Sequence, residues 1–357
     1  MRFGVALNMP GERDRSDAEV VQGYLALGDL AEPLGFDSLF VLEHHFTEYV
    51  LSPSPLQLLA YFAGRTRRIN LGTAVIVLPW HDPIRVAEQI AVLDILSNGR
   101  CLFGFGRGRA ELEFKGFRVP MAEARGRFLE ASEIIVGCLA EDEFEYHGHF
   151  FDIPRISIRP RPASDPQERF YGSSMSAESA KIIAHLGFGM LLSTQKPWPD
   201  LGSDVVQFNR LTVEAGYTPR SPIIIGSVSV AESRNEAQER ALEHIGSELT
   251  MIDAHYRYSE GQLSSITGYE SYKSAESHFQ RLGSHSFRKQ AAAEYAEMQL
   301  VGTPNDCIDQ ILELHRHTGF ERLVLEFSYG GLRQQEAEAN MRMFAREVMP
   351  RVPNSSE

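Results

Sequence analysis

The sequence predicts an α/β protein folded as a (β/α)8 TIM barrel. Short apolar runs typical of buried strands alternate with stretches of helical spacing. The alternation continues until eight strands have been counted, the number that closes such a barrel. No linker divides the 357 residues, so we expect one domain over 1–357. A two-domain, doubly wound sheet is the alternative.

Each predicted strand is an apolar run bounded by turn residues. The first ends at Asn8-Met9-Pro10-Gly11, and the second follows the turn Gly35-Phe36-Asp37. The predicted strands cover residues 2–7, 38–45, 70–78, 100–105, 170–174, 189–193, 222–230 and 321–327.

The helices between the strands carry recognisable start and stop signals. Ser16-Asp17 opens the first helix, and Pro83 begins another that stops at Ser97-Asn98-Gly99. The predicted helices cover about 16–34, 55–66, 83–97, 123–139, 176–186, 205–215, 233–249 and 334–348.

Two insertions interrupt this rhythm. The first insertion follows the fourth strand. Residues 145–151 predict a hairpin with Gly148 at its turn, and an irregular segment containing several prolines leads from it to the fifth strand. After the seventh strand, the segment from Tyr258 to Lys289 is polar, rich in serine and weakly periodic. A structureless segment of that length in a compact domain is functional or disordered. We therefore expect a long mobile loop over about 258–290.

The composition excludes several classes of function. A hydrophobic content of 43% and a charged content of 23% are those of a globular protein with a large core. The net charge of −13 argues against nucleic-acid binding, so an anionic ligand would need a locally basic pocket. No apolar run is long enough to span a membrane, and the N-terminus runs straight into a strand, so we expect a cytoplasmic protein without a signal peptide. The three cysteines are far apart and predict reduced thiols, with no metal site.

The second strand ends in the most conspicuous group of titratable residues, Glu43-His44-His45. Parallel sheets usually keep their chemistry at the carboxyl ends of the strands. Because neighbouring strand residues point to opposite faces, His44 shares a face with Leu42, whereas His45 shares one with Glu43. We expect His44 to face the pocket. The alternative is that both histidines are structural residues at the strand edge.

A second group of residues predicts an anion site. The fourth strand closes with Gly104-Phe105-Gly106-Arg107-Gly108, which lets the backbone approach a ligand and offers one guanidinium. Ser176 and Ser179 share a face of the first turn of a helix, where free N–H groups favour anions. In the alternative reading, Arg107 pairs with a nearby glutamate and the serines cap the helix. Arg109 stands where a dinucleotide fingerprint would need its third glycine.

Several segments in order along the chain resemble one family. The match includes Leu42-Glu43-His44-His45-Phe46-Thr47-Glu48, Val77-Leu78-Pro79, Phe103-Gly104 with Arg107-Gly108, Val301-Gly302-Thr303-Pro304 and Val348-Met349-Pro350. In these segments the chain resembles the bacterial luciferase-like flavin-dependent monooxygenases, and most of all their catalytic (alpha) luciferase subunit. The resemblance covers essentially the whole chain and implies a (β/α)8 barrel.

The resemblance also implies roles for individual residues. His44 would be the catalytic residue, stabilising a flavin peroxide or acting as an acid–base. Glu88 and His45 would lie at a dimer interface formed by the second and third barrel helices, and a homodimer is the simpler expectation. The Ala74-Val75 bond would be a non-proline cis peptide under the flavin ring. The FMN site would comprise Ala74, Val75, Gly106, Arg107, Met175, Ser176 and Ser179, with the phosphate on the arginine and the two serines.

The function implied by the resemblance is that of a two-component monooxygenase. Reduced FMN (FMNH2), supplied by a separate flavin reductase, would activate O2 as a flavin peroxide and oxygenate an apolar organic substrate of the aldehyde or secondary-metabolite type. The 258–290 segment would be a lid that excludes water. A deazaflavin-dependent oxidoreductase on the same fold is one alternative, and a non-catalytic flavin-binding partner subunit is another.

The chain also departs from the luciferase pattern. Gly106 stands where the catalytic luciferase subunit has a reactive cysteine, and Thr194-Gln195 replaces a tryptophan-containing stretch. These differences put a fatty-aldehyde pocket in doubt, and nothing in the sequence requires light emission.

Overall fold

Parallel strands close into a barrel in the computed structural model, which describes residues 1–11, 14–174, 176–281 and 285–353. Each strand pairs with the next, and the last returns to the first, so the predicted fold class is confirmed. Around the barrel the strands are β1 (Arg2–Leu7), β2 (Ser38–Val41), β3 (Asn70–Thr73) with β4 (Ile76–Val77), β5 (Cys101–Gly106), β8 (Phe170–Ser173), β9 (Gly189–Ser193), β10 (Ile223–Val230) and β12 (Arg322–Glu326).

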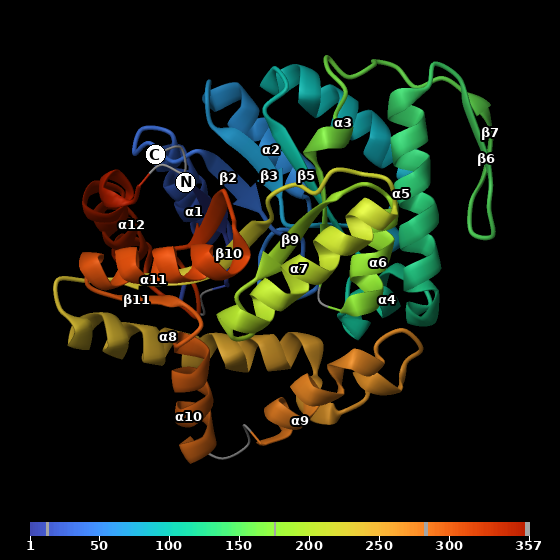
Figure 1. Ribbon diagram of the computed structural model, residues 1–357. Helices are drawn as coiled ribbons and strands as arrows, with labels where there is room; N and C mark the ends of the chain where they lie inside the picture. The colour runs from blue at the N-terminus through green and yellow to red at the C-terminus, as the bar shows by residue number, and fades with distance from the viewer. Residues whose placement is uncertain (12–13, 175, 282–284, 354–357) are drawn as a thin grey trace.

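Helices surround this barrel (Figure 1). Their starts follow the expected chemistry: Ser16 and Glu19 form a reciprocal capping box, and Asp82 caps the helix that begins at Pro83. The helices are α1 (Asp17–Ala31), α2 (Pro55–Arg65), α3 (Pro83–Ser97), α4 (Glu111–Phe117), α5 (Ala124–Ala140), α6 (Ala177–His185), α7 (Trp198–Glu214), α8 (Arg234–Tyr256), α9 (Lys273–Arg281), α10 (His285–Ala296), α11 (Pro304–Thr318) and α12 (Gln334–Met343). Among the described residues, none of the helices is both long and apolar enough to cross a membrane.

Two of the three hydrophobic clusters in the described part of the chain belong to the barrel, and the third lies beneath the segment after α8. The larger barrel cluster lies between the strands and the helices, and it contains all three cysteines as buried free thiols. A smaller cluster fills the barrel interior with residues such as Phe40, Leu191 and Val324. This inner packing ends in Leu42, Ala74 and Val75, which are only partly buried and form the floor of a cavity.

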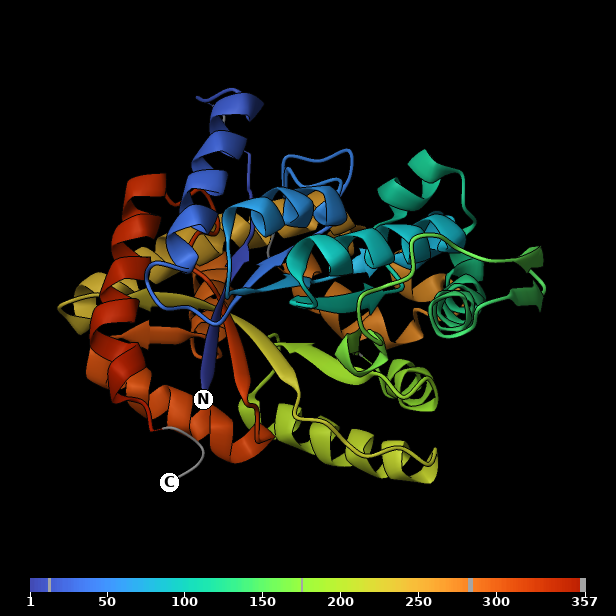
Figure 2. The same ribbon diagram turned by 90° about the horizontal axis from the view of Figure 1, so that it is seen from above.

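The predicted hairpin is confirmed. β6 (Phe144–His147) and β7 (Asp152–Ile156) are antiparallel, and the Gly148 N–H donates to the Phe151 carbonyl at 2.9 Å across the turn. Both views show the hairpin projecting beyond α5, away from the barrel (Figures 1 and 2).

The predicted third strand, 70–78, is interrupted. β3 ends at Thr73, the Ala74–Val75 peptide bond is cis as expected, and β4 then resumes the pairing with β5. The Thr73 hydroxyl bridges the gap, because it accepts from the Gly104 N–H at 2.8 Å and donates to the Gly104 carbonyl at 2.9 Å. The break leaves the Ala74–Val75 segment facing the cavity.

The expectation of a loop without secondary structure over 258–290 is wrong. Three short 3-10 turns, η4 (Tyr258–Glu260), η5 (Leu263–Ser265) and η6 (Glu270–Tyr272), lead into α9, and α10 follows the undescribed residues 282–284. Four buried apolar side chains anchor the described part: Tyr258, Leu263, Tyr269 and Phe279. Their irregular spacing among serines hid them from a periodicity argument. The segment continues the layer that α8 forms along one side of the molecule (Figure 1).

Candidate active site

A cavity lies where the carboxyl ends of the barrel strands converge. Its walls come from strands β8, β9, β10 and β12 and from the segments after β2, β3 and β5. Tyr256 at the end of α8 and Tyr272 in η6 contribute from the overlying layer. The lining residues include Leu42, Glu43, His44, Ala74, Val75, Gly106, Arg107, Arg109, Glu113, Ser173, Ser179, Tyr256, Tyr272 and Glu326.

Glu43 is an ionised structural anchor at the base of this cavity. It is 2% exposed and accepts from the Val77 N–H at 3.0 Å and from the Trp80 indole N–H at 2.8 Å. Its Oε1 also lies 3.0 Å from His45 Nε2 and 2.8 Å from His81 Nε2. Burial acts to raise the pKa of Glu43, but the hydrogen bonds from the two imidazoles and the indole outweigh it and lower the pKa to about 2. This carboxylate therefore has little capacity left for a ligand.

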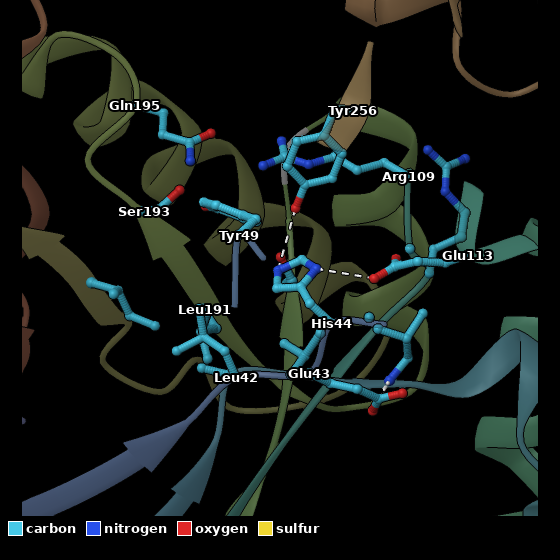
Figure 3. A pocket seen from close by; sticks show the side chains of 18 of the residues that line it. Leu42, Glu43, His44, Tyr49, Arg109, Glu113, Leu191, Ser193, Gln195 and Tyr256 are labelled. Atoms are coloured by element: carbon cyan, nitrogen blue, oxygen red, sulfur yellow. Dashed lines mark hydrogen bonds and ion pairs between the residues drawn. The ribbon is translucent and has the colours of Figure 1, made fainter. Parts of the chain in front are cut away.

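His44 and His45 point in different directions, as the strand alternation predicted. His45 turns to Glu43 and packs its ring edge-on against Phe117, with ring centroids 4.6 Å apart. His44 lines the cavity, with Nδ1 lying 3.2 Å from Glu113 Oε1 and Nε2 lying 3.4 Å from the Tyr256 hydroxyl (Figure 3).

The protonation of His44 follows from its two neighbours. Burial acts to raise the pKa of Glu113, but hydrogen bonds from His255 and His44 more than offset it and lower the pKa to about 2. Burial lowers the pKa of His44 and exceeds the opposing effect of Glu113. At neutral pH, a neutral imidazole therefore faces a carboxylate that can only accept. His44 must carry its proton on Nδ1, which leaves the Nε2 lone pair to accept from Tyr256.

Glu113 joins three elements at this point. The same Oε1 accepts from the His45 backbone N–H at 2.8 Å and lies 3.4 Å from Nε2 of the buried His255. The ligand atoms of His44, Glu113 and His255 all lie within 4.8 Å of one another, which is close enough to hold a metal ion. Because Glu113 Oε1 is already engaged by these donors, a metal would have to displace them.

In the expected anion site, Arg107 contacts the overlying segment, and the two serines form a helix cap. Arg107 lines the cavity, but it forms no ion pair with Glu111 or Glu113: its Nη1 donates to the Gly268 carbonyl at 2.7 Å, and its guanidinium lies 4.0 Å from the ring centroid of Tyr269. Both Gly268 and Tyr269 belong to the segment expected to form a lid. The same carbonyl accepts from Arg125 at 3.3 Å, so two guanidinium groups converge on one oxygen.

The two serines form the helix cap that was the alternative to phosphate binding. Ser176 Oγ accepts from the Ser179 N–H at 3.2 Å and lies 3.1 Å from the Ser179 hydroxyl. The Ser179 side chain still lines the cavity, together with Ser173. Met175, the other residue expected here, lies outside the described residues. Capping does not exclude anion binding, so the phosphate role of the serines stays a prediction.

Gly106 cannot carry a side chain without movement of its neighbour. A Cβ at Gly106 would lie 2.4 Å from Val75 Cγ2. Val75 therefore occupies the space that the side chain of a cysteine at position 106 would need. Both residues line the cavity next to Ala74, as expected for the ring platform.

A second, larger cavity adjoins the first. Its volume is about 870 Å³, and it lies between the start of α7, the end of α8 and the helices α9 and α10. The two cavities share Arg109, Gln195 and Tyr272. None of the sequence motifs indicated this chamber.

Two carboxyl groups near the cavity, the buried Glu248 and the half-buried Glu326, have raised pKa values. Burial and the neighbouring charge of Glu326 raise the pKa of Glu248 well above its usual range, and burial likewise raises the pKa of Glu326. Glu248 contacts Asn8 at 3.4 Å, and Glu326 accepts from Ser227 at 3.0 Å. With both pKa values raised, the pair carries less negative charge at a given pH than two free carboxyl groups would.

The two residues expected at the dimer interface lie on different elements, Glu88 on α3 and His45 in the segment after β2. Glu88 is half-buried on α3, while His45 is held by Glu43. Exposed apolar side chains stand on the two helices expected at the interface: Tyr61 on α2, and Val92, Ile95 and Leu96 on α3.

Sequence reasoning missed four residues that organise the site. Glu43 was placed only as a strand-face partner of His45, and Glu113 only as a possible partner of Arg107. Arg109 was noted only because it is not a glycine, and Tyr256 carried no signal at all, since it reaches His44 across 212 positions of sequence.

Known proteins resemble this chain over almost its full length. Residues 1–322 match the family model of the luciferase-like monooxygenases. An alkanal monooxygenase alpha chain from Photorhabdus laumondii is 28% identical over 353 residues, which is 98% of this chain and 97% of the relative.

Solved structures agree in fold. The monooxygenase RslO1 from Streptomyces bottropensis superposes with a TM-score of 0.82 at 26% identity, covering 98% of this chain and 99% of that chain. The oxygenating constituent of 3,6-diketocamphane monooxygenase from Pseudomonas putida, in complex with FMN, has a TM-score of 0.78 at 17% identity, with 99% of each chain covered. An F420-dependent secondary alcohol dehydrogenase has a TM-score of 0.75 at 18% identity, again with 99% of each chain covered.

Proposed function

The chain belongs to the luciferase-like monooxygenase family of flavin-dependent enzymes, and we propose that it uses reduced FMN and molecular oxygen to oxygenate an apolar organic substrate. One observation carries this proposal: a neutral imidazole with a fixed tautomer and a guanidinium line the same cavity at the carboxyl end of the barrel. The FMN complex of a protein with the same fold supports the choice of cofactor.

The residues present fit FMN. Arg107 and the hydroxyls of Ser173 and Ser179 supply a cation and hydrogen-bond donors for a phosphate. Ala74 and Val75 supply an apolar platform of the kind that a flat ring needs. Bound FMN, in its reduced form, would supply the oxygen chemistry.

The chain's own residues would control protons and water. Glu113 holds the Nδ1 proton of His44, which leaves Nε2 facing the cavity as a base or hydrogen-bond acceptor. Tyr256, whose hydroxyl meets that Nε2, and Tyr272 would shield the site from water. The described part of the 258–290 segment would serve as the cover through Gly268 and Tyr269, which contact Arg107.

Two partners are part of the proposal, a flavin reductase and a second copy of this chain. Without a dinucleotide fingerprint, it would take reduced FMN from a separate flavin reductase in the cytoplasm. The exposed apolar residues of α2 and α3, flanked by Glu88, support a homodimer through these helices.

The proposal is tested by mixing the protein with photoreduced FMN and oxygen and following flavin absorbance and substrate oxidation. Arg107→Ala should weaken FMN binding by about 1.5–3 kcal/mol, the scale of a charged hydrogen bond. His44→Ala should leave FMN binding intact and lower turnover on the order of 100-fold. Arg127→Ala, on the outer helix α5, is the control for both measurements. Normal turnover in His44→Ala would reduce His44 to a structural role.

A deazaflavin-dependent oxidoreductase is the second candidate, favoured by the similarity to the F420-dependent dehydrogenase. Direct titration with FMN and with F420 separates the two, since each enzyme should prefer its own cofactor. A non-catalytic partner subunit would bind flavin without turnover.

A further inference from the structure

We propose that Arg109 binds an anionic group of the substrate, so that the second cavity takes organic acids with an apolar body. This inference rests on the proposed function only in naming the ligand as a substrate. Neither Arg109 nor the second cavity is part of the expected FMN site.

Arg109 stands at the junction of the two cavities, enclosed by aromatic rings. Its guanidinium carbon lies 4.5 Å from the ring centroid of Tyr256 and 5.9 Å from those of Tyr258 and Tyr272. Figure 3 shows the side chain reaching across the Tyr256 ring. Such faces stabilise a cation and hold the planar group in place, but they carry no negative charge of their own.

The charge of Arg109 has no acidic partner. Across the described ranges, no carboxylate lies within ion-pair distance of its guanidinium. The ionised carboxylates of the first cavity serve other donors: Glu113 holds His44 and the His45 N–H, and Glu43 holds Trp80 and two other imidazoles. The remaining acid on that wall, Glu326, accepts from the Ser227 hydroxyl, and burial raises its pKa.

Arg109 is half-buried, and the rings around it stabilise its charge without neutralising it, so the guanidinium can still pair with an anion. The other cation of the chamber is paired in this way, since Lys196 contacts Asp204. Arg109 lacks such a partner although it is flanked by two cavities. An anionic ligand group would satisfy it, and a planar carboxylate matches the guanidinium with two parallel hydrogen bonds.

The chamber defines the rest of the ligand. A volume of about 870 Å³ is that of a pocket for a drug-sized molecule. Much of its wall is apolar, with Trp198, Leu249, Ile252, Phe279 and Met298. Three acids, Glu294, Glu297 and Glu313, also line it. They would repel an anion, so the charged end of the ligand should lie at Arg109, next to the first cavity, with its apolar body in the chamber.

The test compares 2-naphthoate with its neutral amide, 2-naphthamide, by calorimetry and by the fluorescence of Trp198, which lines the chamber. The wild-type protein should bind the carboxylate at least about tenfold more tightly, the effect of one charged hydrogen bond. Arg109→Gln should abolish this preference and leave amide binding unchanged, whereas Arg109→Lys should retain part of it. Lys196→Gln, which removes the paired cation of the same chamber, should retain it fully.

Equal binding of acid and amide by the wild-type protein, including the absence of measurable binding of either, overturns the proposal, as does a preference that survives in Arg109→Gln. The wild-type comparison remains decisive if a variant does not fold. FMN is titrated into the same samples. Loss of FMN affinity in Arg109→Gln with an intact carboxylate preference would assign Arg109 to the cofactor instead. Failure of the wild-type protein to bind FMN would refute the proposed function and leave the carboxylate preference standing.

Discussion

Replacing Glu113 by glutamine should destabilise the protein in a pH-dependent way. The substitution keeps the shape of the side chain and removes its charge. The carboxylate oxygen accepts from the His45 N–H at 2.8 Å and from His44 at 3.2 Å. A hydrogen bond to a charged acceptor contributes about 1 kcal/mol more than a neutral one, so two such bonds predict a loss of about 2 kcal/mol at pH 7.

The pKa of Glu113 supports an effect of this size. A carboxyl whose pKa falls from 4.5 in the unfolded chain to about 2 in the folded one contributes roughly 3 kcal/mol. Because the folded pKa is lowered, this contribution is complete above the unfolded pKa and is lost as the pH falls toward the folded pKa. The wild-type advantage should therefore shrink by about 0.8 kcal/mol at pH 4 and by about 2 kcal/mol at pH 3.

Urea unfolding at pH 7, 5, 4 and 3, followed by tryptophan fluorescence, measures the effect. Glu111→Gln is the matched control, since this neighbour on α4 is paired only with Lys115 at the surface and should change stability by less than about 0.5 kcal/mol. Equal stability of Glu113→Gln and wild type at pH 7, or a difference that does not vary with pH, would refute the assigned role of the carboxylate. Turnover should also fall in Glu113→Gln, because the His44 tautomer is no longer fixed by a charge.

Three further changes test other features. Glu248→Gln should have the opposite pH dependence and stabilise the protein at pH 7. A carboxyl whose pKa is raised in the folded state destabilises the folded protein as the pH rises above the unfolded pKa, and glutamine removes this cost. The gain should vanish near pH 4 in the same urea series. Gly106→Ala should cost about 1–3 kcal/mol of unfolding free energy, and adding Val75→Ala should recover much of it, as measured by the double-mutant cycle. Leu96→Glu should shift the sedimentation coefficient from dimer to monomer, whereas Val213→Glu on α7 should not; unchanged sedimentation in both would reject the α2–α3 interface.

Most of the barrel could be predicted from the sequence because the barrel strands are buried apolar runs and several helices have a start signal, such as the Ser16 capping box of α1 and Pro83 of α3. The exceptions have physical reasons. The strand β11 (Leu300–Gly302) has only three residues, too few for a periodic pattern. The helix α11 does carry signals, since Thr303 and Asp306 form a capping box and Gly319 follows its last turn, but of these residues only Thr303 enters the prediction, as part of a family motif. In the 258–290 segment, the serine-rich composition predicts a mobile loop, but buried side chains such as Tyr258 and Tyr269 hold the described part in place.

The site could be predicted only where its residues are neighbours in sequence. Strand alternation separated His44 from His45 because backbone geometry fixes the direction of adjacent side chains. No such rule links His44 to Tyr256, or Arg107 to the Gly268 carbonyl, because these contacts depend on how α8 and the segment after it settle over the barrel. The pKa of His44 is likewise set by burial and by Glu113, which sequence alone does not place beside it.

The electrostatics of the cavity explain how a chain of charge −13 can accept an anion. Glu43 and Glu113 are ionised, but hydrogen-bond donors surround them, and raised pKa values reduce the negative charge of Glu248 and Glu326. The charges left to face a ligand are then the guanidinium groups of the arginines at 107 and 109. If this balance is correct, removing the charge of Glu113 should leave FMN affinity equal or higher while turnover falls. Loss of both together would mean that the carboxylate shapes the binding site itself and does not merely position His44.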